Sequence, residues 1–294
     1  MRLKVKLKVY NNGKFSTYGS TSLQNLLEKW IINNDFLKKE KNTFLLGKKS
    51  RKRNNLYGFV LNESNCTVVM KVSEISKEYK FWRRIDLILT NLIKDYNFNS
   101  YNHSIHLYES NVPTIKPLAY WTYKPTLFKR KSYFLYEKVE SELSVTELYE
   151  EIMSSNLGQK DRLMDIVSDK CISIVQSIHM ANIRHDDPHG GNILTDIMKE
   201  NIESLTTEGL AKSKFTLIDN DRCTSALIKA EPIKRFFDIK CLTKFNINKI
   251  QQQELLQKYL GDEYNYFWLK VLKFWESGGF SLKNRVYAIV KNSG

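Results

Sequence analysis

The sequence predicts an α+β fold of two lobes, in which a small antiparallel β-sheet precedes a mainly helical part. Residues 3–9 alternate between apolar and basic side chains, and residues 66–72 and 132–140 are rich in β-branched and aromatic side chains, as strands are. Residues 163–178 instead carry apolar side chains every three or four positions, which indicates a long buried helix. The order of these patterns places the sheet first and the helical lobe second.

Length and composition agree with two lobes joined by a short hinge. The chain has 294 residues, 42% of them hydrophobic, which is enough for one large core or a two-lobed pair. It has only 5 prolines, and we find no repeat or Gly/Ser-rich linker. We place the N-terminal lobe at residues 1–139 and the C-terminal lobe at residues 140–294. Residues 1–41 are expected to extend the first lobe by a hairpin and a helix over residues 22–33, with an interaction arm as the alternative.

The segment from His185 to Asn192 reads H-D-D-P-H-G-G-N and carries the most specific pattern in the chain. Its histidine, aspartate and asparagine are spaced as in kinase catalytic loops. In such loops the aspartate accepts the proton of the attacking hydroxyl, and the asparagine holds magnesium against the phosphates. The pattern therefore predicts phosphoryl transfer, with Asp187 as catalytic base and Asn192 as a metal ligand. A polar turn before a strand is the alternative.

A second candidate metal ligand follows downstream. The apolar run of residues 215–218 ends at Asp219, and kinases place a metal-binding aspartate after such a strand. Mg²⁺ favours one or two carboxylates together with substrate phosphates, which fits Asp219 and Asn192. An acidic turn is the alternative. We interpret the polar stretch of residues 199–214, which separates the two motifs, as an insertion.

A lysine within the strand-like residues 66–72 has the position of a phosphate-binding group. Kinases carry such a lysine in the small lobe, oriented by a glutamate from the next helix. This pattern selects Lys71, and the helical periodicity of residues 73–92 offers Glu78 as its partner, with Glu74 as the alternative. A lone lysine near a strand end is otherwise a surface group.

The remaining nucleotide contacts are expected at the hinge. The strand-like residues 132–140 lead into it, so the backbone of Glu137 and Val139 is expected to meet the adenine of ATP. No G-x-G-x-x-G occurs, and the candidate phosphate-covering loop is residues 47–58, whose basic run at residues 48–53 could equally be a solvated loop. In this order the motifs indicate a protein-kinase-like fold that uses ATP and Mg²⁺.

The residues around Asp187 indicate which classes of kinase the chain resembles. Protein serine/threonine kinases usually have lysine two positions after the base, whereas His189 gives the form D-x-H-x-G-N. That form is similar to small-molecule kinases, including aminoglycoside and choline phosphotransferases. It also resembles the ubiquinone-synthesis kinases, whose K-x-G-Q motif is absent here, and the lipopolysaccharide core kinases.

The best overall resemblance is to the lipopolysaccharide core kinases, which phosphorylate Kdo or heptose. Four further segments are similar to that family in order over about residues 43–265. They are V-P-T-I-K-P-L-A at residues 112–119, L-I-D-N-D-R at 217–222, K-R-F-F-D-I-K-C-L at 234–242 and Y-L-G at 259–261.

The resemblance implies an ATP-dependent kinase whose acceptor is a sugar hydroxyl of the lipopolysaccharide inner core. The acidic residue at 186, the insertion at residues 199–214 and the first forty residues depart from the family pattern. A protein serine/threonine kinase, another small-molecule kinase and a pseudokinase that only binds remain alternatives.

Charge and cysteine usage define the expected environment. The net charge is +14 and the sequence pI is near 9.4, so the surface favours anionic partners. No nucleic-acid motif appears, and an anionic inner-membrane surface fits the resemblance better; solubility alone is the alternative. The four cysteines show no metal-binding spacing, and we find no signal peptide or spanning segment. We expect a cytoplasmic protein bound peripherally to the inner membrane.

Overall fold

The structure is a computed structural model. It describes residues 6–10, 13–33, 44–45, 54–61, 66–73, 95–126, 129–141, 143–225, 238–239, 257–261 and 270. Every structural statement below refers to these residues.

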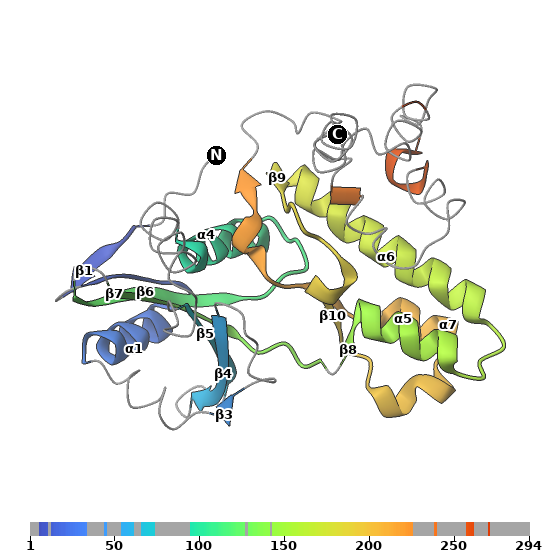
Figure 1. Ribbon diagram of the computed structural model, residues 1–294, viewed down its shortest axis with the longest axis horizontal. Helices are drawn as coiled ribbons and strands as arrows, with labels where there is room; N and C mark the ends of the chain where they lie inside the picture. Colours follow the sequence, from blue (N-terminus) through green and yellow to red (C-terminus); the bar gives the residue numbers. More distant parts are fainter. Residues whose placement is uncertain are drawn as a thin grey trace, which may run out of the picture.

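A seven-stranded antiparallel sheet forms the N-terminal part of the molecule (Figure 1). Its spatial order is β1-β2-β6-β7-β5-β4-β3. The strands are β1 (Lys8–Tyr10), β2 (Gly13–Thr17), β3 (Phe44–Leu45), β4 (Asn54–Leu61), β5 (Cys66–Ser73), β6 (Pro117–Thr126) and β7 (Lys129–Glu137). The sheet ends at Glu137, close to the lobe boundary placed at residue 139, which itself stays a prediction.

The two faces of the sheet carry different helices because strand side chains alternate. On one face, α1 (Thr21–Ile32) packs Leu27 and Ile31 against a cluster that includes Met70 and Trp121. The opposite face packs against α4 (Tyr96–Glu109), which contributes apolar side chains to a second cluster. Figure 1 shows α1 below the sheet and α4 above it. Since Met70 faces α1, its neighbour Lys71 points to the side of α4.

The N-terminal hairpin differs from the predicted half-buried strand over residues 3–9. The described strand begins at Lys8, and Leu7 and Val9 are exposed, Val9 by 75%. The prediction was wrong for these side chains because β1 is the edge strand of the sheet, whereas α1 packs on its central strands. α1 lies where the helix was expected, and Ser20 caps it by accepting a hydrogen bond from the Leu23 N–H.

The helix predicted over residues 73–92 lies almost wholly outside the described residues. At its start, Ser73 belongs to strand β5, so the helical prediction was wrong for that residue. The described helix on this face of the sheet is α4, which begins after Asp95. The Asp95 carboxylate accepts hydrogen bonds from the backbone N–H groups of Asn97 and Phe98 and so fixes the first turn.

The C-terminal part is built from short strands and helices. In chain order they are β8 (Leu143–Ser144), α5 (Val145–Ser154), α6 (Lys160–Met180), β9 (Ile183–Arg184), η1 (Gly190–Asn192), β10 (Ile193–Thr195), η2 (Lys199–Ser204), α7 (Thr207–Lys212), β11 (Phe215–Leu217), η3 (Asn220–Arg222) and β12 (Thr224–Ser225). The strands form a three-stranded sheet, β11-β10-β8, and a two-stranded sheet, β12-β9. Both small sheets are antiparallel.

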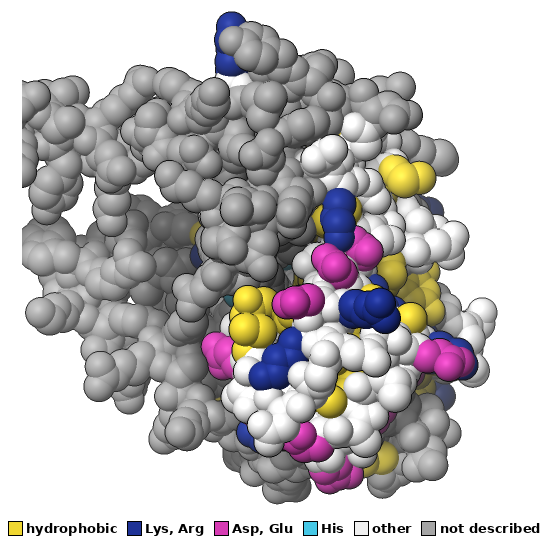
Figure 2. Space-filling view, turned by 90° about the vertical axis from the view of Figure 1, so that its right-hand side faces the viewer, with side chains coloured by type: hydrophobic (Ala, Val, Ile, Leu, Met, Phe, Trp, Pro, Cys, Tyr) yellow, Lys and Arg dark blue, Asp and Glu magenta, His cyan; other side chains and the backbone are white. Residues whose placement is uncertain are grey.

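The stretch of residues 199–214 has its own secondary structure, although it was expected only as a polar insertion. It forms η2 and α7, and it places Ile202 and Leu210 in the core. Figure 2 shows the end of the molecule that includes the α5 and α7 region of Figure 1, where Lys/Arg and Asp/Glu side chains of the described residues are interspersed. Ion pairs such as Lys212–Glu208 and Lys199–Glu151 belong to this part of the chain.

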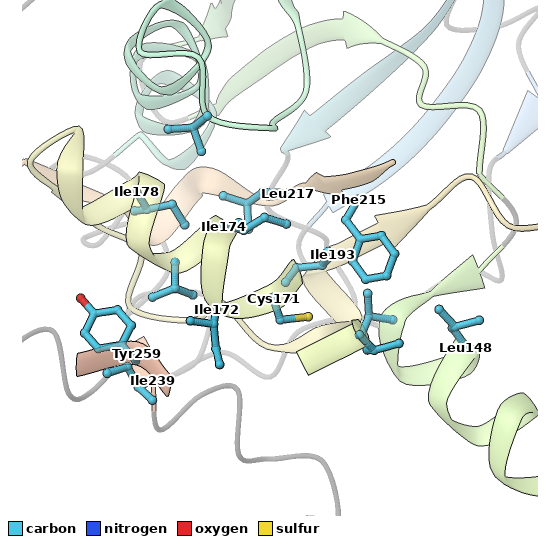
Figure 3. Packing of buried hydrophobic residues seen from close by; sticks show 14 of the residues in the cluster. Leu148, Cys171, Ile172, Ile174, Ile178, Ile193, Phe215, Leu217, Ile239 and Tyr259 are labelled. Atoms are coloured by element: carbon cyan, nitrogen blue, oxygen red, sulfur yellow. The ribbon is translucent and has the colours of Figure 1, made fainter. Parts of the chain in front are cut away.

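Helix α6 is the centre of the C-terminal core (Figure 3). Its buried side chains include Leu163, Val167, Cys171, Ile174 and Ile178, which are the apolar positions that the sequence predicted. They pack against β10, β11 and α5, and residues 259–260 of the distant C-terminal segment join the same cluster. The packed helix therefore fixes the start of the segment that leads through β9 to the loop of residues 185–192.

Candidate active site

Lys71 lies at the centre of a group of charged side chains from both parts of the molecule. Its Nζ donates a hydrogen bond to Asp219 Oδ1 at 2.6 Å and lies 3.6 Å from Asp221 Oδ2. The Lys71 side chain is only 8% exposed. Because it is buried and ion-paired, Lys71 is not a snorkelling surface lysine, and strand β5 is held against the residues that follow β11.

The ion pairs shift the pKa values of this group in opposite directions. Burial acts to lower the pKa of Lys71, but attraction to Asp219 and Asp221 outweighs it and raises that pKa above its usual value. Burial acts to raise the pKa of Asp219, but the charge and hydrogen bond of Lys71 bring it below its usual range. For Asp221, burial and the Asp219 charge outweigh the lysine and raise the pKa. Lys71 and Asp219 therefore each stabilise the charged form of the other.

Asp187 and Asn192 are fixed within one tight loop. The Asp187 carbonyl accepts hydrogen bonds from the His189 N–H at 2.9 Å and from Asn192 Nδ2 at 3.0 Å. The Asp187 carboxylate lies 2.9 Å from Arg222 Nη1 and 3.9 Å from His189 Nε2. Since the Asn192 amide nitrogen faces Asp187, its amide oxygen is directed away from that carbonyl and can serve as a ligand.

The strand pairing brings Asn192 and Asp219 to the same end of the small sheet. Asn192 directly precedes β10, Asp219 follows β11, and the two strands are antiparallel with Ile193 opposite Leu217. The Ile218 N–H donates to the Asn192 carbonyl at 2.8 Å, which continues the ladder to this end. Asp219 itself adopts a left-handed backbone conformation, with φ 60° and ψ 53°.

This pair fits the needs of a Mg²⁺ ion. It supplies one carboxylate and one amide oxygen, both hard oxygen ligands, and leaves most coordination positions to water or phosphate. The Asp219 side chain is 43% exposed, so it can be reached from solvent. Within the described ranges, no group of three or more His, Cys, Asp or Glu side chains is arranged as a metal site.

A buried carboxylate that the sequence did not assign to the site anchors the loop. Asp238 accepts hydrogen bonds from the backbone N–H groups of His185 and Asp186, both at 2.8 Å. Its Oδ2 also lies 2.9 Å from His179 Nε2, on helix α6. Asp238 thereby joins α6 to the residues immediately before Asp187. The resemblance places it in the K-R-F-F-D segment, but no local pattern could predict a contact across more than fifty residues.

His185 is buried between this anchor and η3. Its Nε2 is 3.3 Å from Asn220 Oδ1, and because Asn220 Nδ2 donates to Ser104 and Thr114, the Asn220 oxygen acts as acceptor. His185 therefore donates from Nε2. Its buried Nδ1 has no hydrogen-bond partner among the described residues, so a proton on Nδ1 would lack an acceptor. The geometry favours the neutral ring.

We expect this neutral histidine to make stability depend on pH. Burial lowers the pKa of His185, and the attraction of nearby carboxylates does not reverse the shift. Below about pH 6.5 the unfolded chain binds a proton there that the folded protein excludes, so stability falls with decreasing pH, by up to about 1.4 kcal/mol per pH unit. Urea unfolding between about pH 7.5 and about pH 5.5 should show a steeper decline for the wild type than for His185→Gln. Equal slopes would contradict the assignment.

Helix α4 holds the backbone of Lys71 through Asn97, a residue that the sequence analysis did not assign to the site. Asn97 Nδ2 donates to the Lys71 carbonyl at 3.2 Å and to the Ser132 carbonyl on β7 at 2.7 Å. The Asp95 carboxylate also accepts a hydrogen bond from the Tyr120 hydroxyl at 2.6 Å. These contacts fix α4 to the three strands around the candidate phosphate-binding lysine.

The hinge residues lie between the sheet and the C-terminal part. The Glu137 N–H donates to the Lys116 carbonyl at 3.0 Å, and the Lys138 N–H donates to the Thr67 carbonyl at 2.9 Å. Val139 and Ile218 both pack against the cluster between α4 and the sheet. Strand β7 ends at Glu137, so the predicted strand over residues 132–140 was wrong for its last three residues.

Three calls from the sequence fall outside the described residues. They are Glu78 and Glu74, the candidate partners of Lys71, and the basic run of residues 48–53. In the proposed phosphate loop of residues 47–58, the described residues from Asn54 onward form strand β4. The loop prediction was wrong for those residues, because they pair with β5 along its whole length.

The arrangement defines a protein-kinase-like fold, in which an antiparallel sheet with a buried lysine meets a helical part with an acidic loop. The chain belongs to the lipopolysaccharide kinase (Kdo/WaaP) family, whose sequence model matches residues 98–259. It is therefore a phosphotransferase that acts on an alcohol group, and the matched range includes Asp187, Asn192 and Asp219. No curated protein matches the chain.

The chain is also similar to solved structures, at low sequence identity. A structure of WaaP in complex with acyl carrier protein is similar over 80% of this chain and 86% of that chain, with 15% identity and a TM-score of 0.51. The ROP18 kinase domain in complex with AMP-PNP and sucrose is less similar, with 16% identity and a TM-score of 0.39. The match covers 62% of this chain and 51% of that chain. The BubR1 kinase domain has 15% identity and a TM-score of 0.35, and the match covers 76% of this chain and 52% of that chain.

Proposed function

We propose that this kinase transfers the γ-phosphoryl group of ATP to a hydroxyl of Kdo or heptose in the lipopolysaccharide inner core. The observation that supports this most is the convergence of Lys71, Asp187, Asn192 and Asp219 in a member of the lipopolysaccharide kinase family. Positioning and charge stabilisation account for most of the catalysis in phosphoryl transfer, and these residue types supply both.

In this proposal each residue has one task. Asp187 accepts the proton of the attacking sugar hydroxyl, and Lys71 binds the nucleotide phosphates as an ionised group. Asn192 and Asp219 would hold Mg²⁺, which neutralises charge on the phosphate oxygens when bound. Glu137 and Val139 are proposed to meet the adenine through their backbone, and Glu78 remains the proposed partner of Lys71.

The acceptor class is the part of the proposal that a direct assay can test. Purified enzyme with labelled ATP and Mg²⁺ is expected to label dephosphorylated core lipopolysaccharide and to leave casein and myelin basic protein unlabelled. The reason is the D-x-H-x-G-N loop with His189, together with the family match. Labelling of protein without labelling of glycolipid would indicate a protein kinase instead. If only an aminoglycoside or choline were labelled, the enzyme would be another small-molecule kinase.

We further propose that the enzyme works at the anionic inner-membrane surface. The net charge is +14, and the structure has, in its described residues, no helix long and apolar enough to span a membrane. Each basic residue near an acidic lipid surface contributes about 1 kcal/mol, and this attraction acts over a Debye length of about 8 Å at physiological salt. A peripheral association held by charge follows from these magnitudes.

Vesicle binding should therefore depend on lipid charge and salt. We expect the protein to bind phosphatidylglycerol-containing vesicles, to bind neutral vesicles little, and to dissociate as salt increases. Glutamine at the basic positions of residues 48–53 should weaken this binding. A control variant carries glutamine at Lys160, Lys199, Lys212, Lys214 and Lys258, in the part of the chain where charges of both signs alternate. Salt-insensitive binding, or equal losses in both variants, would contradict an electrostatic contact through residues 48–53.

A further inference from the structure

The candidate base is paired with an exposed cation from a neighbouring segment. Arg222 is the last residue of η3, which directly follows Asp219, and its Nη1 lies 2.9 Å from Asp187 Oδ2. The Arg222 side chain is 62% exposed, whereas that of Asp187 is 17% exposed. A mostly exposed arginine is thus paired with the carboxylate that the acceptor hydroxyl must reach.

The ion pair between Arg222 and Asp187 contributes little to the stability of the fold. An exposed ion pair contributes only about 0–1 kcal/mol to folding. The segment is held by other contacts, because the buried Asn220 side chain bonds to Ser104 and Thr114, and Ile218 bonds to the Asn192 carbonyl. These bonds fix the position of η3 without the Arg222 side chain, so the guanidinium is available for a ligand.

The chemistry of the guanidinium indicates which ligand it suits. It carries five N–H donors in a rigid planar fork that matches the oxygens of a carboxylate or phosphate. The contact with one carboxylate oxygen of Asp187 occupies only part of these five donors. A sugar that places its hydroxyl on Asp187 brings its neighbouring substituents within reach of Arg222, since both groups share one oxygen contact.

The charge of the site makes such a contact favourable for an anionic acceptor. Asp187, Asp219 and Asp221 present carboxylates around the reaction centre, and Lys71 is buried against two of them. An acceptor with its own carboxylate or phosphate would be repelled by these groups, because like charges a few ångströms apart interact unfavourably. Arg222 is an exposed cation in direct contact with Asp187.

We propose that Arg222 is a specificity-determining residue that binds an anionic substituent, carboxylate or phosphate, next to the accepting hydroxyl of the sugar. Before the acceptor binds, the guanidinium pairs with Asp187. When the acceptor binds, its anionic group takes over the guanidinium donors and its hydroxyl contacts the released Asp187 oxygen. This inference rests on the proposed function, because it assumes a sugar acceptor at Asp187.

The test compares acceptors that differ only in charge. The probes are a core oligosaccharide whose target hydroxyl is free and which retains its carboxylates and its other phosphates, its carboxyl-reduced form and its fully dephosphorylated form. Each is assayed with wild type, Arg222→Gln and Arg222→Lys, with Lys212→Gln as a control for the loss of one exposed positive charge. We expect wild type to prefer the charged form, and this preference in kcat/KM to fall by about 10- to 100-fold in Arg222→Gln. Arg222→Lys should retain part of it, since it keeps the charge without the fork.

The outcomes separate specificity from a structural role. A preference lost with the reduced form assigns the contact to the carboxylate, and one lost with the dephosphorylated form assigns it to the phosphate. If Arg222→Gln lowers kcat equally for all three acceptors, Arg222 only positions Asp187 and the inference is wrong. An unchanged preference in Arg222→Gln would also overturn it.

Binding without ATP distinguishes this inference from the proposed function. Calorimetric dissociation constants of the same oligosaccharides do not require turnover. If Arg222→Gln weakens binding of the charged form but wild type does not phosphorylate it, the inference holds and the proposed function fails. If wild type phosphorylates charged and uncharged forms alike, the proposed function holds and the inference fails. If wild type neither binds nor phosphorylates any of them, both are overturned.

Discussion

Asp187→Asn is expected to reduce phosphoryl transfer by about 10²–10⁴-fold, the contribution of a positioned general base. The substitution keeps the size of the side chain and leaves the backbone carbonyl that accepts from His189 and Asn192. ATP affinity should stay within a few fold, because Asp187 is proposed to contact the acceptor and Lys71 the nucleotide. Initial rates and nucleotide dissociation constants, measured on the same preparation, check both parts.

The matched comparison is Asp219→Ala, which should lose transfer and also weaken binding of Mg·ATP. Asp219 is the proposed metal ligand and the ionised partner of Lys71, so its removal affects both groups that bind phosphate. If Asp187→Asn kept wild-type turnover, the assignment of the catalytic loop would be wrong. If both variants lost ATP binding equally, Asp187 would belong to the nucleotide site instead.

Asp238→Ala is expected to cause the largest loss of stability. Three donors surround its carboxylate, namely the His185 and Asp186 N–H groups and His179 Nε2, and all three would lose their acceptor. Each unsatisfied buried donor costs about 1–3 kcal/mol, so three of them cost at least about 3 kcal/mol. Breaking a buried ion pair typically costs about 3–5 kcal/mol, which is the loss that we expect. Such a loss is a large fraction of the roughly 5–15 kcal/mol that stabilises a typical domain.

Chemical denaturation of the variants measures this cost. Asp238→Asn keeps one acceptor oxygen and should lose less stability than Asp238→Ala. Asp165→Ala removes a carboxylate that is 70% exposed and should change stability little. Transfer should fall together with stability in the Asp238 variants, because the residues before Asp187 lose their anchor to α6. A loss for Asp238→Ala no greater than that for Asp165→Ala would contradict the anchoring role.

The local patterns of the sequence predicted the elements that depend on local chemistry. Helix α6 was predictable because its buried side chains recur at helical spacing. The proximity of Asn192 and Asp219 was predictable because both motifs flank short apolar strands. Lys71 could be selected because a lysine is unusual within an apolar strand, and the structure shows it buried and ion-paired.

Helix α4 and the anchoring contacts were not predictable by the same means. The face that α4 buries contains Asn97, Ser100, His103 and Ser104, so its hydrophobic pattern is weak although it packs against the sheet. Asp238 and Arg222 act through partners that are distant in the chain, and a single sequence does not reveal which residues pair. Their positions became clear only from the folded structure.

The most direct test of the central claim is to identify the product made from ATP and dephosphorylated core oligosaccharide. Tandem mass spectrometry can locate the added phosphoryl group, with the wild type and Asp187→Asn compared at equal enzyme concentration. We expect one phosphoryl group on a Kdo or heptose residue with wild type and almost none with Asp187→Asn. A phosphoryl group on the protein alone, or equal amounts of phosphorylated sugar with both enzymes, would contradict a core-sugar kinase that uses Asp187.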